Sequence, residues 1–152
     1  IWLGGHALHY HHTKEFNMRQ DVSAARVVMQ SGSPFVQLPC IGVVSAFTVS
    51  KPELEYWLKG KNDLADYLAE NTIKEAESYA KGTAWTRVIW DVTAVAWLLN
   101  DSERFMESRI ISTPVPTYDN FYATDINGYP MRYVYNIKRD ALMTDLLQKL
   151  TK

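Results

Sequence analysis

The hydrophobic positions of this chain alternate between short continuous runs and helical repeats. Residues 1–3 form an apolar run that stops at Gly4-Gly5, which is typical of a buried strand whose end needs an unusual backbone conformation. Apolar side chains then recur at helical spacing over residues 22–29, behind Asp21, a good helix N-cap. Residues 35–38 predict a second strand. A strand, a helix and a strand in this order predict a right-handed parallel crossover.

The middle of the chain is predicted to be helical. The segment at residues 50–53 has a proline and an acidic residue in its first turn, which is typical of a helix start. Helical repeats continue over residues 54–58 and 62–79, and Gly60 separates the two helices. Residues 90–98 form a further helix that is so uniformly apolar that we expect it to be buried on most sides.

The last third of the chain is predicted to contain strands followed by a helix. Residues 109–115 and 131–135 are rich in β-branched and aromatic side chains and predict strands, with Asn127-Gly128 marking a turn between them. Residues 138–150 predict a closing amphipathic helix. The whole pattern predicts a single α/β domain over residues 1–152, with an open, mostly parallel sheet flanked by helices.

Composition and charge narrow the functional classes. The chain has 152 residues, 47% of them hydrophobic, so it can bury a substantial core. A net charge of -1 and a pI near 6.5 argue against nucleic-acid binding, and no apolar run is long enough for a membrane span. The single cysteine, Cys40, excludes an intrachain disulfide, favours a reducing, cytoplasmic setting, and is interpreted as a packing residue.

Glu15 and Asn17 are the first candidates for binding chemistry. They lie two residues apart after a glycine-ended strand, so both can face one crevice if the segment is extended. A carboxylate accepts hydrogen bonds and an amide both donates and accepts, which suits the recognition of a polyol. The plainer interpretation is that both residues cap or solvate the start of the helix that follows Asp21.

Asp91 is a second candidate, at the start of an apolar helix. A carboxylate there is costly unless it caps the helix or binds a cation, and calcium is the hard ion that oxygen ligands prefer. Helix capping is the ordinary explanation. Trp90 before it is either a buried anchor of the helix or a surface on which an aromatic ligand stacks.

Four histidines lie close together in the loop after Gly5. Two or three of them could bind zinc, nickel or copper, or act as an acid beside a leaving group. Histidines in a loop are more often solvated or bonded to the backbone. The four residues are His6, His9, His11 and His12.

The order of these pieces resembles that of the inosine-uridine preferring nucleoside hydrolases. The resemblance covers nearly all of the chain and is most specific in its first third. It implies the C-terminal part of a nucleoside hydrolase-like α/β sheet, since the family's N-terminal aspartate cluster has no counterpart here. The features that carry the resemblance are Gly4-Gly5, Glu15-Phe16-Asn17, Asp21 with Ala24-Ala25, Leu38-Pro39, and an aspartate opening a later apolar helix.

The resemblance also implies an activity and the residues that serve it. Family members hydrolyse the N-glycosidic bond of ribonucleosides with the help of a bound calcium ion. By resemblance, Glu15 and Asn17 would bind ribose hydroxyls beside Phe16, and Asp91 would be a calcium ligand. Trp90 stands where many members of the family have a histidine. A tryptophan at this position resembles the purine-preferring branch of the family, which implies that the Trp90 ring stacks on a purine base.

Two expectations follow for the chain by itself. The family has an asparagine in the loop before the glutamate, where this chain has histidines, so His9 is a further candidate for substrate binding. Because most calcium ligands and the catalytic base are missing, we expect the isolated chain to be inactive and the intact enzyme to act on nucleosides. The alternative is a non-catalytic module that binds a nucleoside or self-associates through an exposed sheet edge, and a homo-oligomer is expected.

Overall fold

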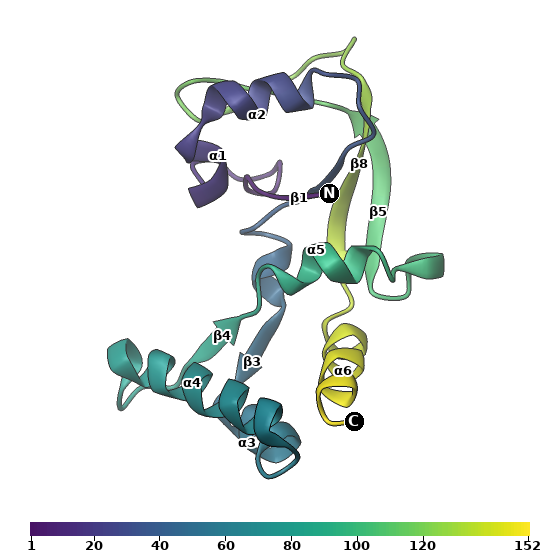
Figure 1. Cartoon of the computed structure of the whole chain (residues 1–152). Coiled ribbons are helices and arrows are strands. Elements are labelled where there is room, and N and C mark those ends of the chain that lie inside the picture. Colours follow the sequence, from purple (N-terminus) through teal and green to yellow (C-terminus); the bar gives the residue numbers. More distant parts are fainter. The chain divides into compact units, whose positions relative to one another are not determined.

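The computed structural model describes residues 1–152, and these form two compact units (Figure 1). The first unit contains residues 1–46 and 90–138, and the second contains residues 47–89 and 139–152. Every candidate residue named above lies in the first unit. The residues predicted to form a single α/β domain thus fall into two units, each with its own strands and helices.

The first unit is built on a four-stranded sheet. Its strands, in spatial order, are β1 (Trp2–Leu3), β2 (Val36–Leu38), β8 (Pro130–Ile137) and β5 (Met106–Ser112). The pairings of β1 with β2 and of β2 with β8 are parallel, and that of β8 with β5 is antiparallel. This order confirms the predicted open, mostly parallel sheet. The antiparallel pair matches the predicted turn at Asn127-Gly128, where the Gly128 amide donates to the carbonyl of Asp125.

Two helices connect β1 to β2, and their apolar side chains pack against the sheet. Helix α1 spans Phe16–Gln20 and helix α2 spans Val22–Met29. As predicted, Asp21 caps α2, because its carboxylate accepts a 2.8 Å hydrogen bond from the Ala24 amide. Side chains from both helices pack on β8 in one buried cluster. Its members are Met18, Ala25, Met29, Met131 and Tyr133.

Helix α5 (Val92–Trp97) follows Trp90-Asp91 as predicted, but the expectation that it is buried on most sides is wrong. Only Thr93 and Ala96 are buried, whereas Val95 is 63% exposed. The helix has just six residues, so a single narrow stripe is all that it buries. The remaining short elements of this unit are η1 (Val44–Ala46), η2 (Asp101–Glu103), β6 (Val115–Pro116) and β7 (Tyr122–Ala123).

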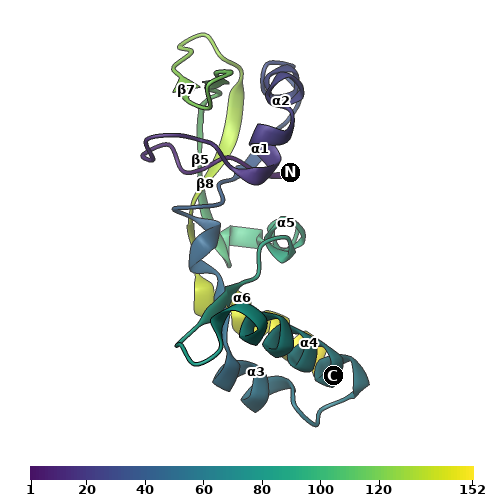
Figure 2. The same cartoon turned by 90° about the vertical axis from the view of Figure 1, so that its left-hand side faces the viewer.

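The second unit is mostly helical. It contains β3 (Thr48–Ser50), α3 (Lys51–Leu58), α4 (Asp63–Ala80), β4 (Thr86–Val88) and α6 (Arg139–Leu150). Strands β3 and β4 form an antiparallel pair, and Figure 2 shows α3, α4 and α6 grouped together. The helix start predicted at Ser50 is confirmed by a capping box with Glu53. None of the helices in the chain combines the length and the apolar character that crossing a membrane requires.

Candidate functional site

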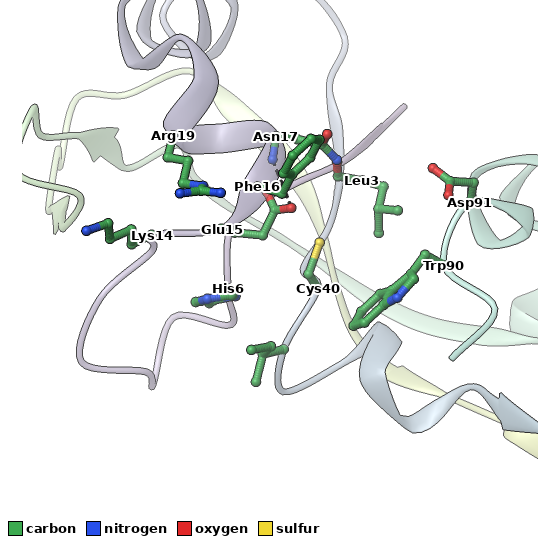
Figure 3. Close-up of a pocket in the computed structure, with 11 residues that line it drawn as sticks. Leu3, His6, Lys14, Glu15, Phe16, Asn17, Arg19, Cys40, Trp90 and Asp91 are labelled. Carbon is green, nitrogen blue, oxygen red and sulfur yellow. Dashed lines mark hydrogen bonds between the residues drawn. The ribbon is translucent and has the colours of Figure 1, made fainter. Parts of the chain in front are cut away.

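A cavity of about 580 Å³ opens in the first unit where β1 and β2 end. Because the two strands are parallel, the loops that follow them meet at the same edge of the sheet, where ligands of α/β folds usually bind. The volume is in the range of small-molecule sites. Figure 3 shows the lining residues, which are Leu3, His6, Lys14, Glu15, Phe16, Asn17, Arg19, Cys40, Ile41, Trp90 and Asp91.

Glu15 is the structural centre of this pocket. Its side chain is 8% exposed, and its carboxylate accepts hydrogen bonds from the amides of Gly5 (2.9 Å), Asn17 (2.9 Å) and Met18 (3.1 Å). The last two bonds make it the N-cap of α1. Glu15 is thus a capping residue, although it caps α1 and not the helix after Asp21. Three backbone bonds and the hydrogen bond with the Cys40 thiol use about four lone-pair positions on the carboxylate, so a ligand hydroxyl would take the place of the thiol.

Asn17 lies beside it within the first turn of α1. Its side-chain nitrogen donates a 2.9 Å hydrogen bond to the carbonyl of Leu3, which fixes the amide against the end of β1. The side-chain oxygen therefore remains as an acceptor. The segment is not extended as the sequence reasoning assumed, because the helix begins at Phe16, yet Glu15 and Asn17 still line the same pocket. Phe16 also lines it, with 62% of its surface exposed.

The close approach of the loop after β1 depends on Gly5. This residue is buried with a φ of +69°, a conformation that side chains disfavour. A Cβ atom there would collide with the hydroxyl of Tyr122 and would lie 2.8 Å from the Thr13 hydroxyl. Burial raises the pKa of Tyr122 to about 12, despite its hydrogen bonds to Thr13 and Gln37, so its phenol stays neutral. Gly5 is therefore required by both space and backbone conformation.

Trp90 and Asp91 reach the pocket from the segment before α5. Trp90 is half-buried and Asp91 is exposed. The expected role of Asp91 as a helix cap is wrong, because its side chain makes no capping hydrogen bond. Its carboxylate is therefore not a buried charge that needs compensation, and it remains available to a cation or a ligand.

His6 and Cys40 form the inner wall of the pocket. His6 is 5% exposed and its Nδ1 atom has no hydrogen-bond partner. Burial lowers the pKa of His6, and the neighbouring His12 adds to this, although the Glu15 charge opposes it. Burial, together with the charge and a hydrogen bond of Glu15, raises the pKa of the Cys40 thiol far above its usual range. Both side chains are therefore neutral at physiological pH.

The other loop histidines do not enter the pocket. His9 is exposed, its ring lies 4.9 Å from that of Tyr10, and it does not line this cavity. Its role in substrate binding remains a prediction. His11 packs edge-on against Phe121, and His12 accepts a hydrogen bond from the Lys14 amide. No group of three or more His, Cys, Asp or Glu side chains in the chain is placed to hold a metal ion, so the histidine metal site is not supported.

Two lining residues, Lys14 and Arg19, were missed by the sequence reasoning. A signal for them was present in the sequence, because Lys14 immediately precedes Glu15. Arg19 follows Phe16 by three positions and therefore lies on the same face of α1. Figure 3 shows both side chains on the side of Glu15 away from Trp90 and Asp91.

Comparison with solved structures defines the fold. Neither a family model nor a curated protein sequence matches the chain. A purine-preferring ribonucleoside hydrolase from Gardnerella vaginalis superposes with a TM-score of 0.71 and 17% identity, covering 97% of this chain and 50% of that one. The chain has a nucleoside hydrolase-like fold. A plant nucleoside hydrolase superposes with a TM-score of 0.68 and 12% identity, covering 89% of this chain and 46% of that one.

The nucleoside hydrolase-like fold confirms the resemblance seen in the sequence. The chain spans about half the length of the solved structures that it matches. At 12% and 17% identity these structures establish the fold, and they do not assign a role to any residue of this chain. The predicted roles of Glu15, Asn17, Trp90 and Asp91 remain predictions.

Proposed function

We propose that this chain forms the sugar-binding and base-binding part of a ribonucleoside hydrolase, an enzyme that cleaves N-glycosidic bonds with water. The observation that carries the proposal is the placement of Glu15, Asn17, Trp90 and Asp91 around one cavity, in a nucleoside hydrolase-like fold. The four residues come from two separate segments of the chain. Their convergence combines polar groups for a sugar with an aromatic ring for a base.

The sugar would be held by Glu15 and Asn17. Both side chains are fixed by hydrogen bonds to the backbone, so they would bind a sugar with little loss of conformational freedom. Asn17 offers its free amide oxygen, and Glu15 offers the oxygen position that the Cys40 thiol occupies. Each oxygen would accept a hydrogen bond from a ribose hydroxyl. The Glu15 carboxylate would also favour the positive charge that develops on the sugar ring as a glycosidic bond breaks.

The base would stack on Trp90. Its indole ring is half-buried and lines the pocket on the side opposite Lys14 and Arg19 (Figure 3). Large aromatic bases gain most from stacking on tryptophan, so we propose a purine preference. Stacking would hold the base as it leaves.

Calcium would be a cofactor of the intact enzyme, although this chain does not complete a site for it. Calcium takes six to eight oxygen ligands. Asp91 supplies one available carboxylate, Glu15 is already engaged, and no group of three acidic or other metal-binding side chains is present. When bound, the ion would supply a water of lowered pKa for attack on the sugar. We propose that Asp91 joins ligands that lie outside these residues.

The test is calorimetric titration of the chain with inosine, paired with an assay for release of hypoxanthine in the presence of calcium. We expect binding without turnover. Asn17→Leu, which removes both the bond to Leu3 and the free amide oxygen, should abolish binding. Failure of the unaltered chain to bind inosine would contradict the proposal, and full turnover would contradict its inactivity.

A second candidate is a nucleoside-binding module without catalysis in any assembly. Strand β1 is the outer strand of the sheet, so an added strand or a second copy could pair with it. Light scattering tests the expected homo-oligomer, and turnover in an assembly with added calcium ligands would exclude this candidate.

A further inference from the structure

The pocket has two ends of different charge. Trp90 and Asp91 form one end, and Figure 3 shows His6, Lys14 and Arg19 at the other. The Glu15 carboxylate lies between them. A neutral nucleoside would use the sugar and base contacts and would leave the cationic end without a partner.

The two positive charges at this end exceed the single negative charge of the nearby Glu15 carboxylate. Neither Lys14 nor Arg19 takes part in an ion pair, and the Arg19 guanidinium lies 5.9 Å from the centre of the Phe16 ring. The nearby Glu15 carboxylate is already stabilised by three backbone amides. A positive potential therefore remains at the mouth of the pocket, where an anion from solvent can reach it.

The two cations are attached to the same short segment as the sugar-binding pair. Lys14 directly precedes Glu15, and Arg19 follows Asn17 by two positions. The backbone amide of Arg19 donates a 2.9 Å hydrogen bond to the Glu15 carbonyl, so one helical turn fixes the spacing between Arg19 and Glu15. An anion held by Lys14 and Arg19 would thus lie close to a sugar held by Glu15 and Asn17.

We propose that the ligand of this pocket is a nucleotide, whose 5′-phosphate is bound by Lys14 and Arg19. This inference rests on the proposed function, because it assumes that Trp90 contacts the base and that Glu15 and Asn17 contact the ribose. The base and the 5′-carbon leave the ribose ring on opposite sides of its oxygen. A base against Trp90 therefore directs the 5′ group toward the cationic end.

The two side chains suit a phosphate in complementary ways. A guanidinium forms paired hydrogen bonds with two phosphate oxygens, and an ammonium on a flexible stem adds a mobile point charge. Lys14 is exposed and lies at the outer edge, so its side chain can move to a bound phosphate. The neutral His6 ring closes the wall beside them.

The experiment compares four ligands by calorimetry on the whole chain. These are inosine, inosine 5′-monophosphate, ribose 5-phosphate and inorganic phosphate. We expect the monophosphate to bind at least about tenfold more tightly than inosine at low salt, since two charge-assisted contacts are added. The advantage should shrink at high salt, because both cations are exposed.

Two variants assign the effect to these residues. The double variant Lys14→Gln/Arg19→Gln should bind the monophosphate no more tightly than it binds inosine. Lys61→Gln is the matched control, because Lys61 is exposed, lies in the second unit and is absent from the pocket. It should retain the full preference for the monophosphate.

The remaining outcomes separate this inference from the proposed function. If inosine binds and the monophosphate binds no more tightly, the inference is wrong and the proposed function stands. If neither compound binds, both are wrong. If inorganic phosphate binds as tightly as the monophosphate, or if the double variant keeps the preference, the assignment of a nucleotide to Lys14 and Arg19 is overturned.

Discussion

The carboxylate of Glu15 accepts a 2.9 Å hydrogen bond from the amide of Gly5, ten residues earlier in the chain. This bond ties the loop after β1 to the first turn of α1, which the same carboxylate caps. One buried side chain therefore holds two walls of the pocket in place. The residue that we propose as a sugar ligand is also the one that shapes the site.

Replacing Glu15 by Gln should destabilise the fold as well as the pocket. The substitution keeps the size of the side chain but puts an NH₂ group among backbone amides that need an acceptor. We expect a loss of about 1–3 kcal/mol in the free energy of unfolding, the usual cost of a buried donor left unsatisfied. Urea denaturation followed by circular dichroism measures it.

Glu70→Gln is the control for this change. Glu70 is exposed on α4, so its replacement should alter the free energy of unfolding by less than about 0.5 kcal/mol. Equal stability of Glu15→Gln and the unaltered chain would show that the three hydrogen bonds at Glu15 do not stabilise the loop.

Replacing Trp90 by Ala should weaken the binding of purine nucleosides. Base stacking on an aromatic side chain contributes about 1–3 kcal/mol, which corresponds to a decrease in affinity of roughly 5-fold to 150-fold. Calorimetry with inosine tests this expectation. Trp57→Ala, in α3 of the second unit, changes a tryptophan that does not line the pocket and should leave the affinity unaltered. An equal loss in both variants would argue against stacking on Trp90.

The local features of the fold were predictable because short-range chemistry determines them. Asp21 as a helix cap, the helix start at Ser50 and the strand before Gly4-Gly5 each depend on residues within one turn or one strand. The order of the sheet was less accessible. Strand β8 lies between β2 and β5, and such long-range pairings leave no mark on the local pattern.

Part of the pocket was predictable because some of its residues lie close together in the sequence. Glu15 and Asn17 were found because their spacing is local, but the sequence did not show that His6, and not His9, lines the cavity. The path of the loop is fixed by distant contacts, such as the bond from the His6 amide to the Thr13 hydroxyl. Similarly, the exposure of α5 depends on how few neighbours surround it, which an apolar sequence cannot reveal.

Cys40 should resist alkylation in the folded chain. Burial and the adjacent Glu15 carboxylate raise the pKa of the thiol, so almost no reactive thiolate exists at pH 8, and the side chain is 5% exposed. We expect iodoacetamide to modify it slowly at pH 8 and rapidly after unfolding in urea, as followed by mass spectrometry. Rapid modification of the folded chain would show that the inner wall of the pocket opens to solvent.

The second unit contains an acid-sensitive contact between α6 and α3. Glu53 accepts hydrogen bonds from the Ser50 amide (2.8 Å) and hydroxyl (2.7 Å) and pairs with Arg139. Arg139 also donates a 3.0 Å bond to the Thr48 carbonyl. Burial alone would raise the pKa of Glu53, but the hydrogen bonds from Ser50 and Arg139 and the Arg139 charge lower it overall.

A lowered pKa in the folded chain means that the ionised form of Glu53 stabilises folding, fully so at a pH above the ordinary carboxyl pKa of the unfolded chain. This stabilisation should be lost as the pH falls through the folded pKa, when the carboxylate takes up a proton. Urea denaturation at pH 7 should therefore show Glu53→Gln to be less stable than the unaltered chain, by about 1–2 kcal/mol. The difference should shrink at pH 3, whereas that for Glu70→Gln should stay small throughout. A difference independent of pH would mean that the charge of Glu53 does not contribute, and that its hydrogen-bonding shape alone supports the contact with Arg139.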